Sequence, residues 1–132
     1  MTSSTRLLLT ASALVTLTAC GGDRNSSPAD LDLSPTASAG REAARANGCA
    51  ACHGLDGQGG AGPPFVGLLG STVELADGSA VRADEAYITN SITDPTRQPM
   101  AGYTSVMPMT ALTADEITTI VAFIKELADR TP

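Results

Sequence analysis

Cys49-Ala50-Ala51-Cys52-His53 is the stretch of this 132-residue chain that decides its fold. The two cysteines have i, i+3 spacing, so one helical turn brings both thiols to roughly the same face. The histidine follows the second cysteine directly, which places an imidazole nitrogen beside the two sulfur atoms. The segment therefore predicts a site at which the chain holds a non-protein group.

The pattern is typical of covalent haem attachment. Each thiol can add to one vinyl group of protoporphyrin IX and form a thioether, and His53 then supplies a nitrogen ligand to the iron. Aromatic residues make up only 3% of the chain and tryptophan is missing, although aromatic side chains usually supply much of a small core. We therefore predict one haem c at Cys49, Cys52 and His53.

Three other kinds of site use closely spaced cysteines. A thioredoxin-like redox pair needs a strand–helix context and no histidine, whereas this pair closes an alanine-rich segment. A disulfide between Cys49 and Cys52 would close a very small loop and stabilise little. A structural zinc site needs four ligands, usually Cys or His, and His53 is the only histidine. All three rank behind haem attachment.

The sixth ligand of the iron must come from elsewhere in the chain, because the sole histidine is already used. Methionine is the soft donor available, and the candidates are Met100, Met107 and Met109. Pro108 disfavours the α region for the residue before it, so Met107 is extended as a ligand loop requires. We rank Met107 first and Met109 second; a thioether that does not bind iron can fill gaps beside the haem.

Residues 1–19 predict a lipoprotein signal peptide. Arg6 precedes an apolar run, 7–15, that suits the centre of an export signal and is too short to span a bilayer. The segment ends in Leu17-Thr18-Ala19-Cys20, which resembles the lipobox of bacterial lipoproteins. We predict an exported protein that acyl chains on Cys20 anchor to a membrane on its periplasmic or other extracytoplasmic side. Ordinary cleavage near Ala19, leaving a free thiol, is the alternative.

Composition divides the mature chain into two parts. Residues 20–38 are rich in Gly, Pro and Ser, and they are predicted to form the lipidated Cys20 followed by a flexible linker. Residues 39–132 are predicted to form one monohaem domain. The formal charge of −6 argues against nucleic acid, whose phosphates would repel the chain, and fits docking onto a basic patch of a protein partner.

The folded part is predicted to be all-α, with three to four helices and long loops around one haem. A first helix is expected over 39–49 with Ser38 as its cap, and another over 84–92 that stops before Pro95. Residues 54–70 are expected to form a glycine-rich loop, and a short hairpin is expected over 72–81.

The clearest predicted helix is the last one. Thr113 and Glu116 match a capping box, and an apolar stripe follows at helical spacing. Its members are Ile117, Ile120, Val121, Ile124, Leu127 and Ala128.

From Gly40 to Leu127 the chain resembles class I cytochrome c. Gly62-Pro63-Pro64-Phe65 is similar to that family's loop in which a proline carbonyl accepts a hydrogen bond from the haem histidine, a role the resemblance gives to Pro63. Val106-Met107-Pro108 is similar to its methionine loop. The family usually pairs an aromatic residue of the first helix with one of the last, but Ala44 stands here in the first helix and only Phe123 is available, so we expect a less well filled crossing.

A closer resemblance is to the cytochrome c domain fused to subunit II of some haem–copper oxidases. It is seen in segments such as Ala83-Asp84-Glu85-Ala86-Tyr87-Ile88 and Ser91-Ile92-Thr93-Asp94-Pro95. The chain has no spare Cys and His for that subunit's copper centre. The resemblance therefore implies a cytochrome c domain that is not fused to a copper-binding domain and is attached to the membrane by a lipid anchor.

The resulting expectation is a monomeric electron carrier, not an enzyme. Its implied partners are a terminal oxidase and a quinol-oxidising complex. A haem enzyme or gas sensor with an open iron site is the first alternative, and it gains weight only if Met107 does not bind iron. A haem-free lipoprotein is the second.

Overall fold

A computed structural model describes residues 31–130 of the chain. The predicted signal peptide 1–19, the predicted lipidation site Cys20 and most of the predicted linker lie outside these residues. Within the part that is described, no helix combines the length and the apolar character needed to cross a membrane.

The first helix, α1, spans Pro35–Ala46 and begins earlier than predicted. Its cap is Ser34, whose hydroxyl accepts a hydrogen bond from the backbone N–H of Ala37 at 3.2 Å; the prediction of Ser38 as cap was wrong. Pro35 suits the first helical position because its fixed φ is helical and its missing N–H would have no partner there. Leu31 and Leu33, which precede the cap, pack against the core.

The last helix, α4, spans Ala114–Glu126 and has the predicted capping box. The Thr113 hydroxyl accepts a hydrogen bond from the Glu116 N–H, and the Glu116 carboxylate accepts one from the Thr113 N–H. The apolar stripe faces inward, as expected. Three of its members, Ile120, Ile124 and Leu127, are almost fully buried, and so is Phe123 beside them.

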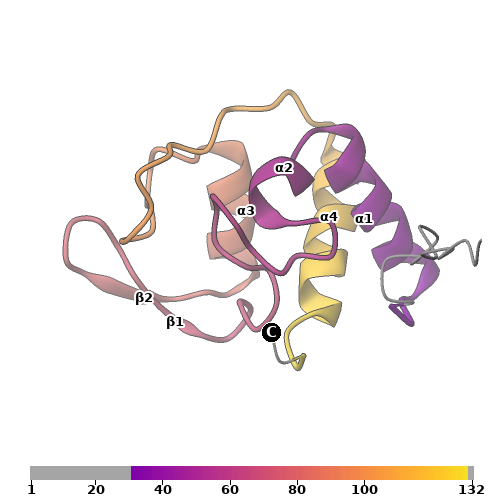
Figure 1. Ribbon diagram of the computed structural model, residues 1–132, viewed down its shortest axis with the longest axis horizontal. Coiled ribbons are helices and arrows are strands. Elements are labelled where there is room, and N and C mark those ends of the chain that lie inside the picture. The colour runs from indigo at the N-terminus through magenta and orange to yellow at the C-terminus, as the bar shows by residue number, and fades with distance from the viewer. Residues whose placement is uncertain (1–30, 131–132) are drawn as a thin grey trace, which may run out of the picture.

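Helices α1 and α4 cross on one side of the molecule (Figure 1). Gly40 makes the close approach possible, because a Cβ atom at this position would collide with the backbone carbonyl of Thr119. Ala37 and Ala44 are buried on the same helix. Small residues of α1 therefore bring its backbone against α4.

The remaining elements lie between residues 72 and 93. Strands β1, Thr72–Glu74, and β2, Ala80–Arg82, pair antiparallel with Val73 opposite Val81, which confirms the predicted hairpin. Helix α3 spans Glu85–Thr93, and the Asp84 carboxylate caps it by accepting a hydrogen bond from Tyr87 N–H at 2.7 Å. The helix stops before Pro95, as expected.

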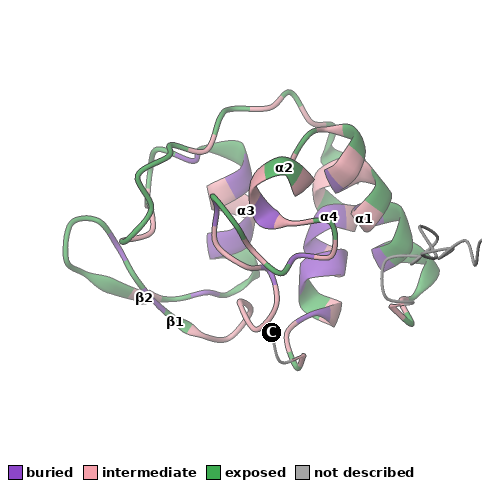
Figure 2. Ribbon diagram, viewed as in Figure 1, coloured by how far each residue is buried: buried purple, intermediate pink, exposed green. Residues whose placement is uncertain are grey.

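Burial is concentrated on the inner faces of α3 and α4, whereas the hairpin and the loop before α4 are largely exposed (Figure 2). From the segment that follows α2, Phe65 reaches the core. With α2, Ala50–His53, the described chain has four helices and one small hairpin. This confirms the predicted small, mostly helical fold with long loops.

Candidate haem site

The two cysteines lie on a separate short helix. Asn47 and Gly48 separate α1 from α2, and Gly48 adopts a φ of 80°, a left-handed conformation that suits glycine after a helix end. The predicted single helix over 39–49 is therefore wrong at its end, since Cys49 is the N-cap of α2. Cys49 and Cys52 are half-buried and not joined in a disulfide. Burial raises the pKa of the Cys49 thiol, so it is protonated at neutral pH.

The His53 ring is held in the tautomer that suits a metal ligand. Its Nδ1 atom lies 2.7 Å from the carbonyl oxygen of Pro63, so the Nδ1–H donates to that carbonyl and Nε2 keeps a free lone pair. This is the hydrogen bond that the resemblance implied for Pro63. Burial lowers the pKa of His53, while the bond to Pro63 opposes this shift. The buried ring is therefore neutral, the form that binds a metal.

The backbone after α2 wraps closely around His53. Gly59 N–H donates to the His53 carbonyl at 2.8 Å, and Gly62 N–H donates to the Cys52 carbonyl at 2.9 Å. A Cβ atom on Gly62 would lie 3.0 Å from the His53 ring, so only glycine fits without displacing the imidazole. The glycine-rich composition of this loop thus allows it to pack against the ring.

Phe65 has a role that the sequence did not reveal. Its ring stacks on the His53 imidazole at a centroid distance of 4.5 Å and an interplanar angle of 19°. The Phe65 ring also contacts the ring of Phe123 edge to face, at a centroid distance of 6.3 Å. The aromatic partner of Phe123 therefore comes from the loop after α2, whereas the resemblance led us to look for one at Ala44.

A cavity of about 380 Å³ lies against the cysteines and His53. Its size falls within the usual range for ligand sites. Cys49, Cys52, His53 and Met107 all contribute to its wall, together with apolar side chains of α3 and α4. Among the described residues that form this wall, none is Asp, Glu, Lys or Arg. An apolar wall of this kind fits a flat, largely apolar macrocycle.

The three methionines lie in different environments. Met107 is half-buried and lines the cavity, as does Met100, which forms an isolated β-bridge with Leu75. Met109 is 76% exposed and does not contribute to the cavity wall. The geometry thus agrees with Met107 as the first candidate and favours Met100 over Met109 as the second, the reverse of the predicted order. Ligation of iron by Met107 stays a prediction.

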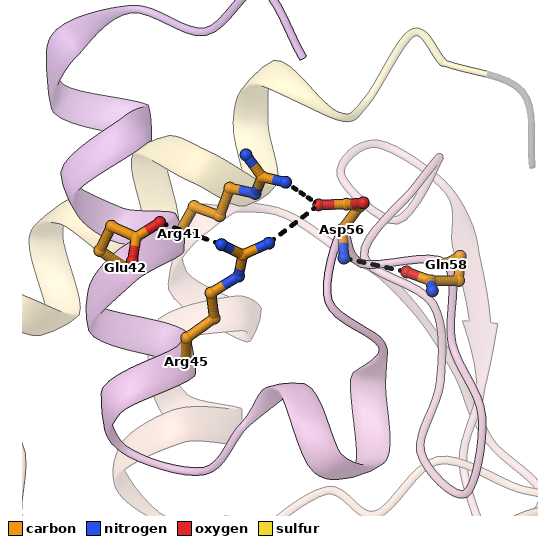
Figure 3. A network of polar contacts seen from close by, with 5 residues as sticks. All are labelled: Arg41, Glu42, Arg45, Asp56 and Gln58. Carbon is orange, nitrogen blue, oxygen red and sulfur yellow. Dashed lines mark hydrogen bonds and ion pairs between the residues drawn. The ribbon is translucent and has the colours of Figure 1, made fainter. Parts of the chain in front are cut away.

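Sequence reasoning also missed a polar cluster beside the site. Arg41 and Arg45 of α1 both reach the carboxylate of Asp56 in the loop that follows His53 (Figure 3). The available signal was the i, i+4 spacing of two arginines on one helix face, an arrangement that is unfavourable unless an acid lies between them.

The fold and this site together define a small helical protein with a cavity suited to a covalently attached haem. Residues 37–128 match the family model for cytochrome c, and the chain belongs to that family. A comparison with curated proteins finds no match. The family implies covalently bound haem c, for which Cys49 and Cys52 provide the thioether positions, and its members usually carry electrons.

Proposed function

We propose that this protein shuttles single electrons at a membrane surface through a haem that His53 and Met107 ligate. The observation that carries the proposal is the shared cavity, in which a neutral imidazole with a free Nε2 and a thioether both contribute to the wall. Histidine and methionine together fill both axial positions of a haem iron and favour a relatively high potential. An iron with both positions filled exchanges electrons rather than binding substrates.

The composition of the cavity wall supports the same proposal. A bound haem supplies reversible one-electron chemistry at its iron. The wall residues contribute no ionic side chain, and a poorly polar environment disfavours the additional positive charge of an oxidised centre. The residues of this chain therefore favour the reduced form and support a carrier that delivers electrons to an acceptor of higher potential.

Membrane attachment through Cys20 and a respiratory partner complete the proposal. The lipobox-like sequence supports the anchor, and the resemblance to a domain of oxidase subunit II supports a terminal oxidase as acceptor and a quinol-oxidising complex as donor. The chain has 14 acidic and 8 basic residues. This balance suits a basic docking surface on the partner.

The central experiment is expression in a host that matures c-type cytochromes, followed by mass spectrometry and spectroscopy. We expect the added mass of one haem, a reversible one-electron couple, and a reduced form that does not bind carbon monoxide. Rapid carbon monoxide binding by the wild-type protein would instead favour the haem enzyme or sensor with an open iron site.

The anchor is tested separately by Cys20→Ser. We expect the wild-type protein in the membrane fraction and the variant in the soluble fraction, with equal haem content. Pelleting of both proteins would contradict the lipid anchor and leave the electron-carrier proposal untouched. Electron transfer to a basic partner is expected to slow as salt is added, because screening weakens the attraction.

A further inference from the structure

Two arginines from α1 hold a single carboxylate in the loop that follows His53 (Figure 3). The Nη2 atoms of Arg41 and Arg45 both contact Oδ1 of Asp56, the second at 3.5 Å. Glu42 accepts a hydrogen bond from Arg45 Nη1 at 3.2 Å on the solvent side. We call Arg41, Arg45 and Asp56 the α1–loop clamp.

The clamp is largely shielded from solvent, unlike the other ion pairs. The side chains of Arg41, Arg45 and Asp56 are 14%, 25% and 22% exposed, whereas that of Glu42 is 66% exposed. Both arginine Nε atoms are buried without a hydrogen-bond partner among the described residues. Pairs with this degree of burial are less screened by solvent and salt than surface pairs.

The loop that the clamp holds is intrinsically loose. Gly54, Gly57 and Gly59 all have positive φ, and glycine carries the largest conformational entropy of any residue. The Asp56 side chain is bound by α1, and its backbone N–H donates to the side chain of Gln58 at 3.0 Å. Asp56 therefore fixes the loop at a point between these glycines.

From Asp56 the ordered backbone leads directly to the groups that hold the imidazole. The carbonyl of Gly57, the next residue, accepts hydrogen bonds from the N–H groups of Phe65 and Val66, at 2.7 and 3.1 Å. Phe65 stacks on the His53 ring, and Pro63 accepts its Nδ1–H. The position of both contacts thus depends on where the clamp sets the loop.

We propose that Asp56, held by Arg41 and Arg45, is a positioning residue for the His53 imidazole. The inference rests on the proposed role of His53 as an iron ligand. The proposed effect is confined to the loop 54–66. Without the clamp this loop opens more often, and the Nδ1–H of His53 loses its partner during each opening. A ligand with a less constant hydrogen bond is a weaker donor to iron.

The test is hydrogen exchange of the His53 Nδ1 proton in the reduced, haem-loaded protein, followed by NMR. We expect Asp56→Asn to accelerate this exchange by about tenfold through local opening, while the backbone amide of Ile124 in α4 exchanges at the wild-type rate. Glu42→Gln is the matched control. This substitution also removes one negative charge beside Arg45. Glu42, however, forms no hydrogen bond or ion pair with the loop.

Two results would overturn the proposal. One is wild-type exchange of the Nδ1 proton in Asp56→Asn; the other is equal acceleration in Asp56→Asn and Glu42→Gln, which would mean that charge alone matters. The reduction potential is measured on the same samples, and we expect a larger shift in Asp56→Asn than in the control.

Arg41→Lys decides the question if Asp56→Asn does not mature. It keeps the charge but lacks the planar fork of arginine, so we expect faster exchange in this variant as well, and an unchanged rate would contradict the clamp. Absence of covalent haem from the wild-type protein would refute the proposed function instead. A failure of the positioning role is seen only in protein that is fully loaded with haem.

Discussion

The two sides of the haem cavity are built in different ways. On the attachment side, residues 47–66 are fixed by backbone hydrogen bonds, by the Pro63 carbonyl and by the stacked ring of Phe65. On the methionine side, no backbone group from Gly102 to Met109 forms a hydrogen bond with another described residue. Val106 and Met109 are also more than three-quarters exposed.

The two sides therefore differ in how far contacts within the polypeptide fix their positions. On the attachment side, contacts within the polypeptide hold His53 in place. The position of Met107 depends on few contacts of the polypeptide, so in our proposal its bond to iron is itself a main restraint on the loop. Local stability follows the density of such contacts, and the methionine side is expected to open first.

The largest effect is expected on the attachment side. His53→Ala removes the only imidazole of the chain. We expect the yield of haem-loaded protein to fall by about tenfold or more, because in our proposal this imidazole is a ligand of the iron. The measurement is intact mass after expression in a maturation-competent host. A variant with full haem content and the wild-type spectrum would contradict the role of His53 on the attachment side.

On the methionine side, Met107→Ala is expected to leave haem attachment intact. We expect loss of the near-infrared sulfur-to-iron band in the oxidised protein and binding of carbon monoxide in the reduced protein, because in our proposal the thioether of Met107 is a ligand of the iron. Met109→Ala is the control, since Met109 does not line the cavity. If Met109→Ala abolishes the band and Met107→Ala does not, our assignment of the ligand is wrong.

The same contrast is expected in denaturant titrations of the wild-type protein. The sulfur-to-iron band is predicted to disappear at a urea concentration about 1 M below the midpoint of helix unfolding, because the loop opens before the helices separate. The two transitions are followed by absorbance and by far-ultraviolet circular dichroism. Coincident midpoints would show that both sides unfold as one cooperative unit.

The smallest effect is expected at Glu116. Hydrogen bonds from the backbone N–H and the hydroxyl of Thr113, and then from the Asn47 amide, hold the pKa of this carboxyl below its ordinary value of 4.5. A carboxyl with a lowered folded pKa stabilises the fold fully above its unfolded pKa and loses this contribution as the pH falls through the folded pKa. Glu116→Gln is therefore expected to lower Tm slightly at neutral pH.

The difference in Tm between Glu116→Gln and wild type is expected to vanish at pH values below the lowered pKa. Thermal melts over a pH series provide the measurement. Asp115→Asn lies in the same helical turn but outside the capping box, so it controls for the general effect of removing a charge there. A constant difference at every pH would exclude ionisation of Glu116 as the cause.

Sequence reasoning succeeded where the determining residues are neighbours in the chain. The spacing of Cys49, Cys52 and His53 defines a chemistry that few other patterns share. The capping box at Thr113 and the hairpin predicted over 72–81 likewise involve residues within a few positions of one another. In each case the local backbone conformation alone decides the structure.

Sequence reasoning failed where the structure depends on residues far apart in the chain, or where two local structures are equally compatible with the sequence. Pro35 fits a flexible linker and a first helical turn equally well, and only the packing of Ala37 against the core decides between them. The stacking of Phe65 on His53 and the binding of Asp56 by Arg41 depend on how the loop folds back onto α1. The spacing of Arg41 and Arg45 indicates only that an acid lies near them. Nothing in the order of the residues identifies that acid as Asp56 or predicts the stacking of Phe65.

The two ends of the described domain are fastened to each other. The backbone N–H of Ser34 donates to the Glu126 carboxylate at 2.9 Å, and Arg130 donates to the Asp32 carbonyl at 3.2 Å. None of these residues lines the haem cavity. A second domain joined at either end would therefore be attached at the same place on the domain. In both fusion orders it would be attached away from the residues that line the cavity.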